Sequence, residues 1–385
     1  MPSVMPIFGT RPEAIKMAPI VIALQESADF ECIVTVTGQH REMLDQVNDL
    51  FGIIPDHDLN ILQQRQSLSA IMTRTMDGLD KLFTASRPDA VIVQGDTTTS
   101  TAGAIAAFYH GIPVIHVEAG LRSGNLFSPF PEEANRKITS QIASLHLAPT
   151  DTSRANLLAE GVAERDIVVT GNTVIDALLT TVNKHIPFSD PQLEELAASG
   201  RRILLVTTHR RENQGDAMRG VGRALARIAD AEPDVTIVLP AHRNPVVREA
   251  VLPALAGKTN VIVTEPLAYG EFTRMLALSH IVLTDSGGVQ EEAPSLGKPV
   301  LVMRDNTERP EAVHAGTVSL IGTDEERIVN EVDRLLNDQE HFDAMANAVN
   351  PYGDGLAAKR TVAAVAELLG VGHRIGEFGL TAALS

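Results

Sequence analysis

The chain has 385 residues, a length that suggests two or three domains. It carries 32 lysines and arginines against 49 aspartates and glutamates, so its net charge is −17, and such a surface repels the phosphates of nucleic acid. A single cysteine, Cys32, excludes an internal disulfide and a cysteine-built zinc site. No leader pattern and no apolar run near the roughly 20 residues of a bilayer span are present. We therefore expect a cytoplasmic protein without a nucleic-acid or membrane partner.

The first half of the chain alternates short β-branched runs with stretches of helical periodicity, which predicts parallel βαβ units. The predicted strands are 4–9, 32–38, 90–96, 113–118, 145–149 and 167–171. Pro6 is out of place in a central strand because it has no N–H to donate. Either the first strand begins at Ile7 or its ladder is locally broken.

The second half repeats the pattern after a segment without strand character, 172–202. Its predicted strands are 203–209, 236–240, 261–265, 281–285, 299–303 and 318–322. The chain is thus predicted to be an α/β protein with two Rossmann-like domains and parallel sheets, 1–172 and 173–355. An amphipathic helix at about 356–370 is expected to pack back on the first domain, and the tail 371–385 has no predicted place.

Residues that follow the strands are the most informative, because ligands of open α/β sheets collect beyond the carboxyl ends of the strands. After the first strand, Gly9 permits a tight turn and Pro12 suits the first turn of a helix. Arg11 and Lys16 would then lie near the helix N-terminus, a favourable place for phosphate oxygens. The alternative is a solvated arginine and lysine at a helix start.

Carboxylates end two apolar runs of the first half. Asp96 and Glu118 are expensive to bury unless they are paired or functional, so we expect their surroundings to tune their pKa values toward catalysis. Glu132 and Glu133 begin a helix after Pro131. As a bare pair they are most simply residues that compensate the helix dipole.

In the second half, the strand 281–285 runs into Ser286, Gly287 and Gly288, a turn whose N–H groups can approach a phosphate. Glu292 follows near the start of the next helix, where it either accepts hydrogen bonds from ribose hydroxyls or compensates the helix dipole. No GxGxxG, Walker, HExxH or GxSxG motif is present, which disfavours NAD, ATP, metal hydrolases and serine hydrolases. We expect neither a cofactor nor a metal.

Two further side chains of the second half have two interpretations each. Arg309 either closes on the same phosphate or pairs with Glu308 or Glu311. His209, at the end of the strand 203–209, either stabilises a diphosphate or makes a capping or interdomain contact.

Long unbroken blocks between about residues 5 and 355 resemble the non-hydrolysing UDP-N-acetylglucosamine 2-epimerases of bacteria. They are FGTRPEAIKMAP (8–19), GQHREM (38–43), GDTTT (95–99), HVEAGLR (116–122), PEEANR (131–136), TGNT (170–173), HRREN (209–213) and TDSGGVQEEAPSLGKP (284–299). The resemblance implies a GT-B fold with its active site in the interdomain cleft and a homodimer. It also implies reversible interconversion of UDP-GlcNAc and UDP-ManNAc for cell-surface polysaccharide precursors.

The resemblance also implies roles for individual residues. The acid/base carboxylates would be Asp96, Glu118 and Glu132, and His209 would act on the diphosphate side. The implied UDP contacts are Arg11, Lys16, Phe272, Ser286, Gly287, Gly288, Glu292 and Arg309. The implied lining of an allosteric UDP-GlcNAc site is Gln39, Glu42, Arg65, Arg210 and His242.

Chemistry limits how such an enzyme can work. The sugar C2 proton is not α to a carbonyl, so its removal needs the neighbouring bond from C1 to UDP to break. The hypothesis is elimination to a bound 2-acetamidoglucal followed by re-addition of UDP. A GT-B glycosyltransferase, a hydrolysing epimerase and a non-catalytic nucleotide-sugar sensor remain the alternatives.

Overall fold

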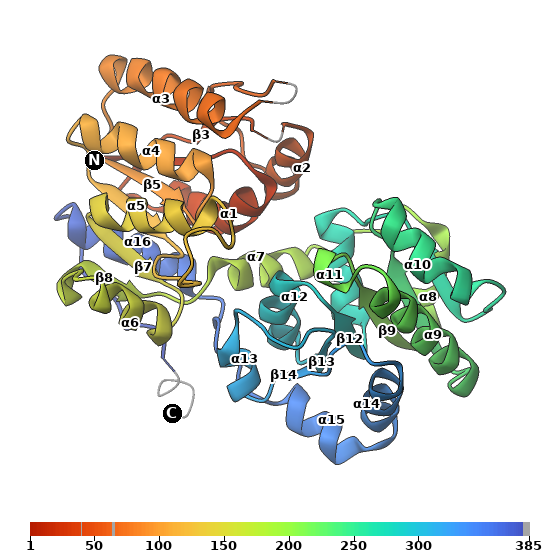
Figure 1. Cartoon of the computed structure of the whole chain (residues 1–385). Coiled ribbons are helices and arrows are strands. Elements are labelled where there is room, and N and C mark those ends of the chain that lie inside the picture. The colour runs from red at the N-terminus through yellow and green to blue at the C-terminus, as the bar shows by residue number, and fades with distance from the viewer. Residues whose placement is uncertain (40, 64–65, 380–385) are drawn as a thin grey trace. The chain divides into compact units, whose positions relative to one another are not determined.

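A computed structural model describes residues 1–39, 41–63 and 66–379 of the chain. The chain divides into two compact units, which are described separately below (Figure 1). Unit 1 comprises Met1–Ala177 together with Tyr352–Ser385, and unit 2 comprises Leu178–Pro351. The domains 1–172 and 173–355 that the sequence suggests stay a prediction.

Unit 1 forms, within the described residues, an eight-stranded parallel sheet. Its strands are β1 (Ser3–Phe8), β2 (Glu31–Cys32), β3 (Thr35–Val36), β4 (His57–Asp58), β5 (Ala90–Gln94), β6 (Val114–Val117), β7 (Leu145–Ala148) and β8 (Ile167–Val169). The order is β4-β3-β1-β5-β6-β7-β8, and β2 also pairs with β1. The helices are α1 (Arg11–Glu26), α2 (Arg41–Phe51), α3 (Leu68–Ala85), α4 (Thr98–Tyr109), α5 (Glu132–Ile142), α6 (Asp151–Ala159), α7 (Thr173–Val182), which continues into unit 2, and α16 (Ala357–Leu368), with the short 3-10 helix η1 (Glu164–Asp166).

Pro6 explains a break in this sheet. The strand predicted over 32–38 is two short strands, β2 and β3, separated by Ile33 and Val34. Val4 and Phe8 each accept a hydrogen bond through their carbonyl oxygens, from the N–H groups of Ile33 and Thr37. Backbone groups of successive residues in a strand point alternately to the two neighbouring strands, so Pro6 faces the same neighbour as Val4 and Phe8. It lies opposite the gap between β2 and β3, where it has no N–H to donate. The first strand therefore begins at Ser3 rather than Ile7, and the ladder is locally broken.

Unit 2 forms a six-stranded parallel sheet in the order β11-β10-β9-β12-β13-β14. The strands are β9 (Arg202–Thr207), β10 (Val235–Pro240), β11 (Val261–Thr264), β12 (Ile281–Thr284), β13 (Val300–Val302) and β14 (Val318–Leu320). Numbered from β9, this is the 3-2-1-4-5-6 order of a dinucleotide-type Rossmann sheet. The helices are α8 (Pro191–Ser199), α9 (Asp216–Ala231), α10 (Pro245–Leu255), α11 (Tyr269–Leu278), α12 (Gly287–Glu292), α13 (Pro310–His314), α14 (Glu325–Asn337) and α15 (Gln339–Ala346), with 3-10 helices η2 (Arg211–Asn213) and η3 (Ala293–Leu296).

Both sheets confirm the predicted class of two Rossmann-like α/β units. Unit 2 has an apolar core in which strand residues such as Leu204, Ile237 and Leu283 meet Val221 and Leu225 of α9. In unit 1 the corresponding core brings strand residues of β1, β5 and β6 against α3 and α4. Burial of these strand faces fixes where each strand ends, and therefore where the residues after it lie.

The C-terminal part of the chain returns to unit 1. Helix α16 packs against α1, and beyond it Phe378 donates its N–H to the carbonyl oxygen of Val169 in β8 at 2.8 Å (Figure 1). The Phe378 ring lies with the small cluster of Ala148, Leu157 and Val169. The described part of the tail thus covers the β8 edge of the sheet, a location that the sequence did not predict.

Candidate active site

Four predicted site residues, Arg11, Asp96, His209 and Ser286, follow the strands that flank the point where the strand order reverses in each sheet. In unit 1 this switch point lies between β1 and β5, and in unit 2 it lies between β9 and β12. Open α/β sheets bind ligands at such points, beyond the carboxyl ends of the strands. Both units therefore place these four residues at the position that the fold favours for a ligand, and Glu118 follows the next strand of unit 1, β6.

Glu118 is held in an unusual conformation directly after β6. Its φ of 61° is in the left-handed region, which a residue other than glycine adopts at a cost of about 1–2 kcal/mol. The buried carboxylate is paired with the ammonium of Lys16 and accepts hydrogen bonds from the side-chain amides of Gln94 and, at 3.1 Å, Asn172. Side chains from three other segments of unit 1 thus converge on this one carboxylate.

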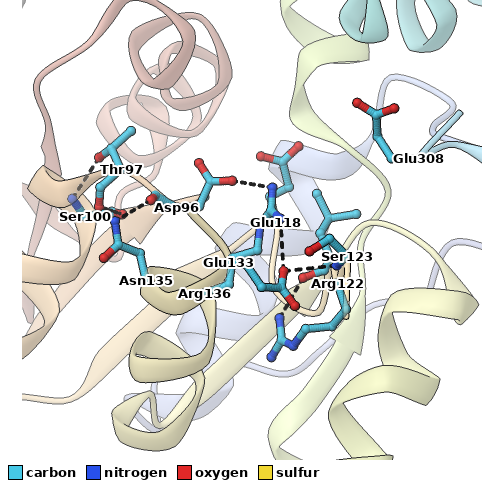
Figure 2. Close-up of polar contacts among 12 residues, drawn as sticks. Asp96, Thr97, Ser100, Glu118, Arg122, Ser123, Glu133, Asn135, Arg136 and Glu308 are labelled. Atoms are coloured by element: carbon cyan, nitrogen blue, oxygen red, sulfur yellow. Dashed lines mark hydrogen bonds and ion pairs between the residues drawn. The ribbon is translucent and has the colours of Figure 1, made fainter. Parts of the chain in front are cut away.

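Asp96 lies in the turn between β5 and α4, two residues after the strand ends. Its carboxylate pairs with the Arg136 guanidinium at 2.5 Å, and its carbonyl oxygen accepts a 2.8 Å hydrogen bond from Asn135 (Figure 2). A Cβ added to the neighbouring Gly95 would lie 3.4 Å from Glu118 Oε2. The turn that carries Asp96 therefore approaches the carboxylate of Glu118.

Glu133 differs from the dipole-compensating role that the sequence suggests. Its side chain is fully buried and accepts hydrogen bonds from the N–H groups of Ser123 at 3.0 Å and Gly124 at 3.2 Å (Figure 2). Arg136 bridges it to Asp96. Burial on its own raises the pKa of Glu133, but these donors outweigh burial and the pKa is lowered. Glu133 therefore anchors the loop after Glu118 and, through Arg136, orients Asp96.

Glu132 and Arg11 occupy the starts of α5 and α1. Glu132 is half-buried and Arg11 is exposed, and neither makes a hydrogen bond or ion pair to the residues that the structure describes. Lys16, in contrast, directs its charge at Glu118. Its predicted contact with UDP stays a prediction.

Glu13 is a buried carboxylate of this region that the sequence did not single out. It accepts hydrogen bonds from the N–H groups of Gly9 and Thr10, at 3.0 and 2.8 Å, and from the Thr97 hydroxyl at 2.5 Å. It joins the loop after β1 to the loop after β5. Burial raises its pKa. The spacing from Thr10 to Glu13 is that of a capping box, which is the pattern that identifies it.

In unit 2, Asp285 connects the loops after β12 and β9. The buried carboxylate accepts hydrogen bonds from the N–H groups of His209 and Arg210, and it lies 3.2 Å from Nδ1 of the His209 ring. The ring is 41% exposed. It stacks on His242 with centroids 5.7 Å apart. Asp285 was not among the predicted site residues, although it follows a buried strand as Asp96 does.

The turn after β12 has the form that the sequence predicts. Ser286 is the N-cap of α12, whose first residues are Gly287 and Gly288. Arg309 lies against this turn, because a Cβ on Gly287 would be 2.7 Å from its Nη1. Its Nε donates to Glu291 at 2.6 Å, and Glu308 lies 3.5 Å from Nη1. Arg309 thus lies at the turn and pairs with Glu308, as one interpretation predicts, while its contact with phosphate stays a prediction.

Two more predicted UDP contacts lie on α11 and α12. Glu292 is buried and accepts a 3.3 Å hydrogen bond from the hydroxyl of Tyr269. Burial and the nearby carboxylate raise the Tyr269 pKa well above its usual value, so the hydroxyl keeps its proton and remains a donor. Phe272 is half-buried, three residues after Tyr269 on the same helix.

The predicted allosteric residues are distributed over both units. In unit 1, Gln39 accepts a 2.8 Å hydrogen bond from Thr99, and Glu42 is exposed on α2. In unit 2, Arg210 donates to the carbonyl of Asp285 and to Glu308. His242, whose pKa is lowered by burial and by the nearby His209, stacks on that ring. Arg65 lies outside the described residues.

The described residues contain neither a metal-binding cluster nor a membrane-spanning helix. No group of three or more histidine, cysteine or carboxylate side chains is arranged to hold a metal ion in the part of the chain that the structure covers. None of the described helices combines the length and apolar character needed to cross a membrane.

Comparison with known proteins was made against family models, curated proteins and solved structures. The family model described as UDP-N-acetylglucosamine 2-epimerase matches residues 22–366. UDP-N-acetylglucosamine 2-epimerase of Escherichia coli K12 is 55% identical over 368 residues, covering 94% of this chain and 98% of the relative. A crystal structure of a UDP-N-acetylglucosamine 2-epimerase superposes with a TM-score of 0.91 at 50% identity and 98% coverage of both chains. The Neisseria meningitidis UDP-GlcNAc 2-epimerase, solved with UDP-GlcNAc bound, has a TM-score of 0.84 at 46% identity, covering 95% of this chain and all of that one.

Proposed function

Because the chain belongs to the UDP-N-acetylglucosamine 2-epimerase family, we propose that it interconverts UDP-GlcNAc and UDP-ManNAc reversibly and without net hydrolysis. The Neisseria relative, which is similar over nearly the whole chain, binds UDP-GlcNAc. The proposed substrate is therefore a nucleotide sugar, and the proposed reaction inverts its C2 centre. Its product would serve as a precursor of cell-surface polysaccharide.

The chemistry proceeds by elimination and re-addition. The bond from C1 to the β-phosphate oxygen breaks, its electron pair goes to UDP, and a carboxylate takes the C2 proton. The bound 2-acetamidoglucal then receives a proton at C2 from the opposite face, and UDP returns to C1. This reaction needs two acid/base groups and a stabilised leaving group, and it consumes no other reactant.

Unit 1 supplies the acid/base groups in this proposal. Asp96, Glu118 and Glu132 share the two proton transfers, and Lys16 and Arg136 hold the first two carboxylates in place by ion pairing with Glu118 and Asp96. A general base of this kind contributes about 10²–10⁴-fold in rate. Breaking an unactivated C–H bond needs more than that, so the departure of UDP must also be stabilised.

Unit 2 supplies that stabilisation. The N–H groups at Gly287 and Gly288, the Ser286 hydroxyl and the Arg309 guanidinium line one turn and would hold the diphosphate, together with His209. Glu292, oriented by Tyr269, would accept hydrogen bonds from the ribose hydroxyls, and Phe272 would contact the nucleoside. Arg11 would add a charge from unit 1.

One observation carries the proposal. Two carboxylates follow adjacent parallel strands of one sheet: Glu118 is held by Lys16 and by two side-chain amides, and Asp96 is held by Arg136. Neither a simple nucleotide binder nor a sensor needs two oriented carboxylates, whereas inversion of a carbon centre needs an acid and a base on opposite faces.

Proton exchange at C2 tests the proposal. The purified protein is incubated with UDP-GlcNAc in D₂O, and C2 is followed by NMR. We expect UDP-ManNAc to appear with deuterium at C2, while free UDP stays constant. Accumulation of free UDP and ManNAc would instead identify a hydrolysing epimerase, and transfer of the sugar to an added acceptor would identify a glycosyltransferase. No exchange at all would leave a nucleotide-sugar sensor.

We also propose that the protein forms a homodimer and that UDP-GlcNAc activates it at a second site lined by Gln39, Glu42, Arg65, Arg210 and His242. Light scattering after size-exclusion chromatography measures the oligomeric state. Activation by UDP-GlcNAc predicts that UDP-ManNAc alone is converted slowly until a trace of UDP-GlcNAc is added.

A further inference from the structure

Asp285 is the most heavily hydrogen-bonded carboxylate described above in unit 2, and no step of the proposed reaction uses it. It is fully buried, and it accepts hydrogen bonds from the hydroxyl of Thr208 at 2.9 Å, the N–H groups of His209 and Arg210 at 3.0 Å each, and the Asn213 amide at 3.3 Å. Its other oxygen, Oδ1, also accepts from the His209 N–H at 3.1 Å and lies 3.2 Å from Nδ1 of the His209 ring.

These contacts fix the charge of Asp285. Burial on its own raises the pKa of the carboxyl, but the hydrogen bonds from His209 and Arg210 outweigh burial and the pKa is lowered. The group is therefore an ionised carboxylate, which accepts hydrogen bonds and donates none. The ring nitrogen beside it, Nδ1 of His209, must carry the hydrogen of that contact.

We propose that Asp285 is a positioning residue that holds His209 with Nδ1–H on the carboxylate, so that Nε2 is the ring atom presented to the leaving diphosphate. The proposal rests on the proposed function, in which His209 assists the departure of UDP. When the ring is protonated, Nδ1–H stays with Asp285 and Nε2–H donates to the β-phosphate oxygen as the bond from C1 breaks. The electron pair of that bond goes to the oxygen.

The surroundings of the ring support this arrangement from each element packed against it. His242 follows β10 and stacks on the ring, and its lowered pKa keeps it uncharged. Arg210, the next residue after His209, directs its guanidinium to the Asp285 carbonyl and to Glu308, and Arg248 directs its guanidinium to Glu265 and to backbone carbonyls. Among these described neighbours, Asp285 is the carboxylate in contact with the ring.

Asp285→Asn gives a sharp test because the amide can enter the network in only one orientation. With its oxygen at the Oδ2 position it keeps the bonds from Thr208 and from the N–H groups of His209 and Arg210. Its NH₂ then takes the Oδ1 position and faces Nδ1, and only the 3.1 Å contact of the His209 N–H with Oδ1 is given up. An NH₂ donor there requires Nδ1 without hydrogen, so the ring becomes the Nε2–H tautomer and cannot take a second hydrogen without losing that bond. The change alters the ring while preserving the shape of the side chain.

The experiment measures the tautomer and the kinetics together in the full chain. Two-bond ¹H–¹⁵N spectra of histidine-labelled protein report the tautomer, and the His209 signals are those missing in His209→Asn. We expect Nδ1–H in the wild type at alkaline pH and Nε2–H in Asp285→Asn, with KM changed less than threefold. Turnover should fall about 10²–10⁴-fold, the upper end being the loss for the same change in the serine-protease triad.

Thr208→Val is the matched control, because it removes another donor to the same carboxylate at 2.9 Å without touching the ring. We expect it to keep the Nδ1–H tautomer and to keep turnover within about threefold of the wild type. An Nε2–H tautomer in the wild type would overturn the proposal, as would turnover of Asp285→Asn within threefold of the wild type. If Asp285→Asn does not fold, the wild-type spectrum still tests the proposal, because it reports the tautomer of His209 directly. A wild-type protein without C2 exchange would overturn the proposed function but not the Nδ1–H assignment, so the two failures are distinguishable.

Discussion

The carboxylates proposed to move protons in unit 1 and the cation proposed to hold the diphosphate in unit 2 are paired in opposite senses. In unit 1 the strand-end groups are carboxylates, Glu118 and Asp96, held by Lys16 and Arg136. In unit 2 the cation Arg309 lies at the strand-end turn and is held by Glu291. Anionic groups oriented by cations are suited to moving protons, whereas a cation and free N–H groups beside glycines are suited to holding an anion. The net charge of −17 therefore does not decide what each site can bind, because each site sets its own local field.

Removing the charge of a unit 1 carboxylate is expected to have the largest effect. In Glu118→Gln or Asp96→Asn the side chain keeps its size but cannot take the C2 proton, so turnover should fall about 10²–10⁴-fold. UDP affinity, measured by calorimetry, should change far less, because the predicted nucleotide cradle lies in unit 2. Glu164→Gln, an exposed carboxylate of unit 1, is the control and should keep full turnover. Deuterium appearing at C2 at the wild-type rate in either variant would remove that residue from the acid/base set.

Removing the Arg309 guanidinium of unit 2 is expected to have the next largest effect. Arg309→Ala takes a guanidinium away from the turn at Gly287 and should lower turnover about 10–100-fold and weaken UDP binding, because the developing charge on the leaving phosphate loses a donor. Arg223→Ala removes an arginine of the same unit that pairs with Glu325 at 2.7 Å, away from the strand ends, and is the control. Unchanged turnover in Arg309→Ala would mean that Arg309 serves only its ion pairs.

Much of this site was predictable because strand ends are visible in a sequence. Apolar runs end near Asp96, Glu118 and His209, and parallel strands bring their carboxyl ends to one edge. The structure ends these strands one or two residues earlier, so Asp96 and Glu118 lie in turns and His209 lies in a loop, which a run of apolar letters does not reveal. Strand β4 (His57–Asp58) was missed because two residues of polar sequence carry no period-two pattern.

The groups that orient the site were harder to predict because their partners are distant in sequence. Glu133 resembles any acid in a first helical turn until its contacts with Ser123 and Gly124 are known. Asp285 obeys the same strand-end rule as Asp96, yet the adjacent Ser286 and glycines drew the prediction to the phosphate turn. The long-range bond from Asn172 to Glu118 spans 54 positions and leaves no local pattern.

Glu133, a buried carboxylate outside the proposed acid/base set, separates the orientation of the site from its chemistry in unit 1. Glu133→Gln keeps an acceptor for the loop but loses the charge that pairs with Arg136, so the free energy of unfolding should fall by about 1–3 kcal/mol at pH 7. The pKa of Glu133 is lowered in the folded protein, so this stabilisation is present above the ordinary value of 4.5 and is lost as the pH falls through the folded value. Urea unfolding at several pH values measures the difference, with Glu164→Gln as reference. A difference that does not shrink with acid would contradict the charge-based account.

The sheet cores of the two units should also respond differently to mild acid. Neighbouring strands of unit 1 place His116 opposite His146, and burial lowers their pKa values to about 3 and about 4. The aligned strands β12 and β13 of unit 2 contain no titratable side chain. Because both histidines stay neutral when folded but bind protons near pH 6.5 when unfolded, they favour unfolding increasingly as the pH falls below 6.5 toward 4. From pH 7 to 5.5 each should remove about 1 kcal/mol of stability, the smallest effect predicted here.

Hydrogen exchange read strand by strand can resolve that difference between the units. Between pH 7 and 5.5, after correction for the intrinsic exchange rate, amides of β6 and β7 should lose protection while those of β12 and β13 keep theirs. In His146→Leu the loss of protection should be roughly halved, because one of the two proton-binding sites is gone. The substitution breaks no hydrogen bond of Nδ1, which has no partner among the described residues. His373→Gln, which changes an exposed histidine of the same unit, should leave the pH response as it is in the wild type. Equal loss of protection in both sheets would mean that acid acts through surface charge, and that the histidine pair does not set the response of unit 1.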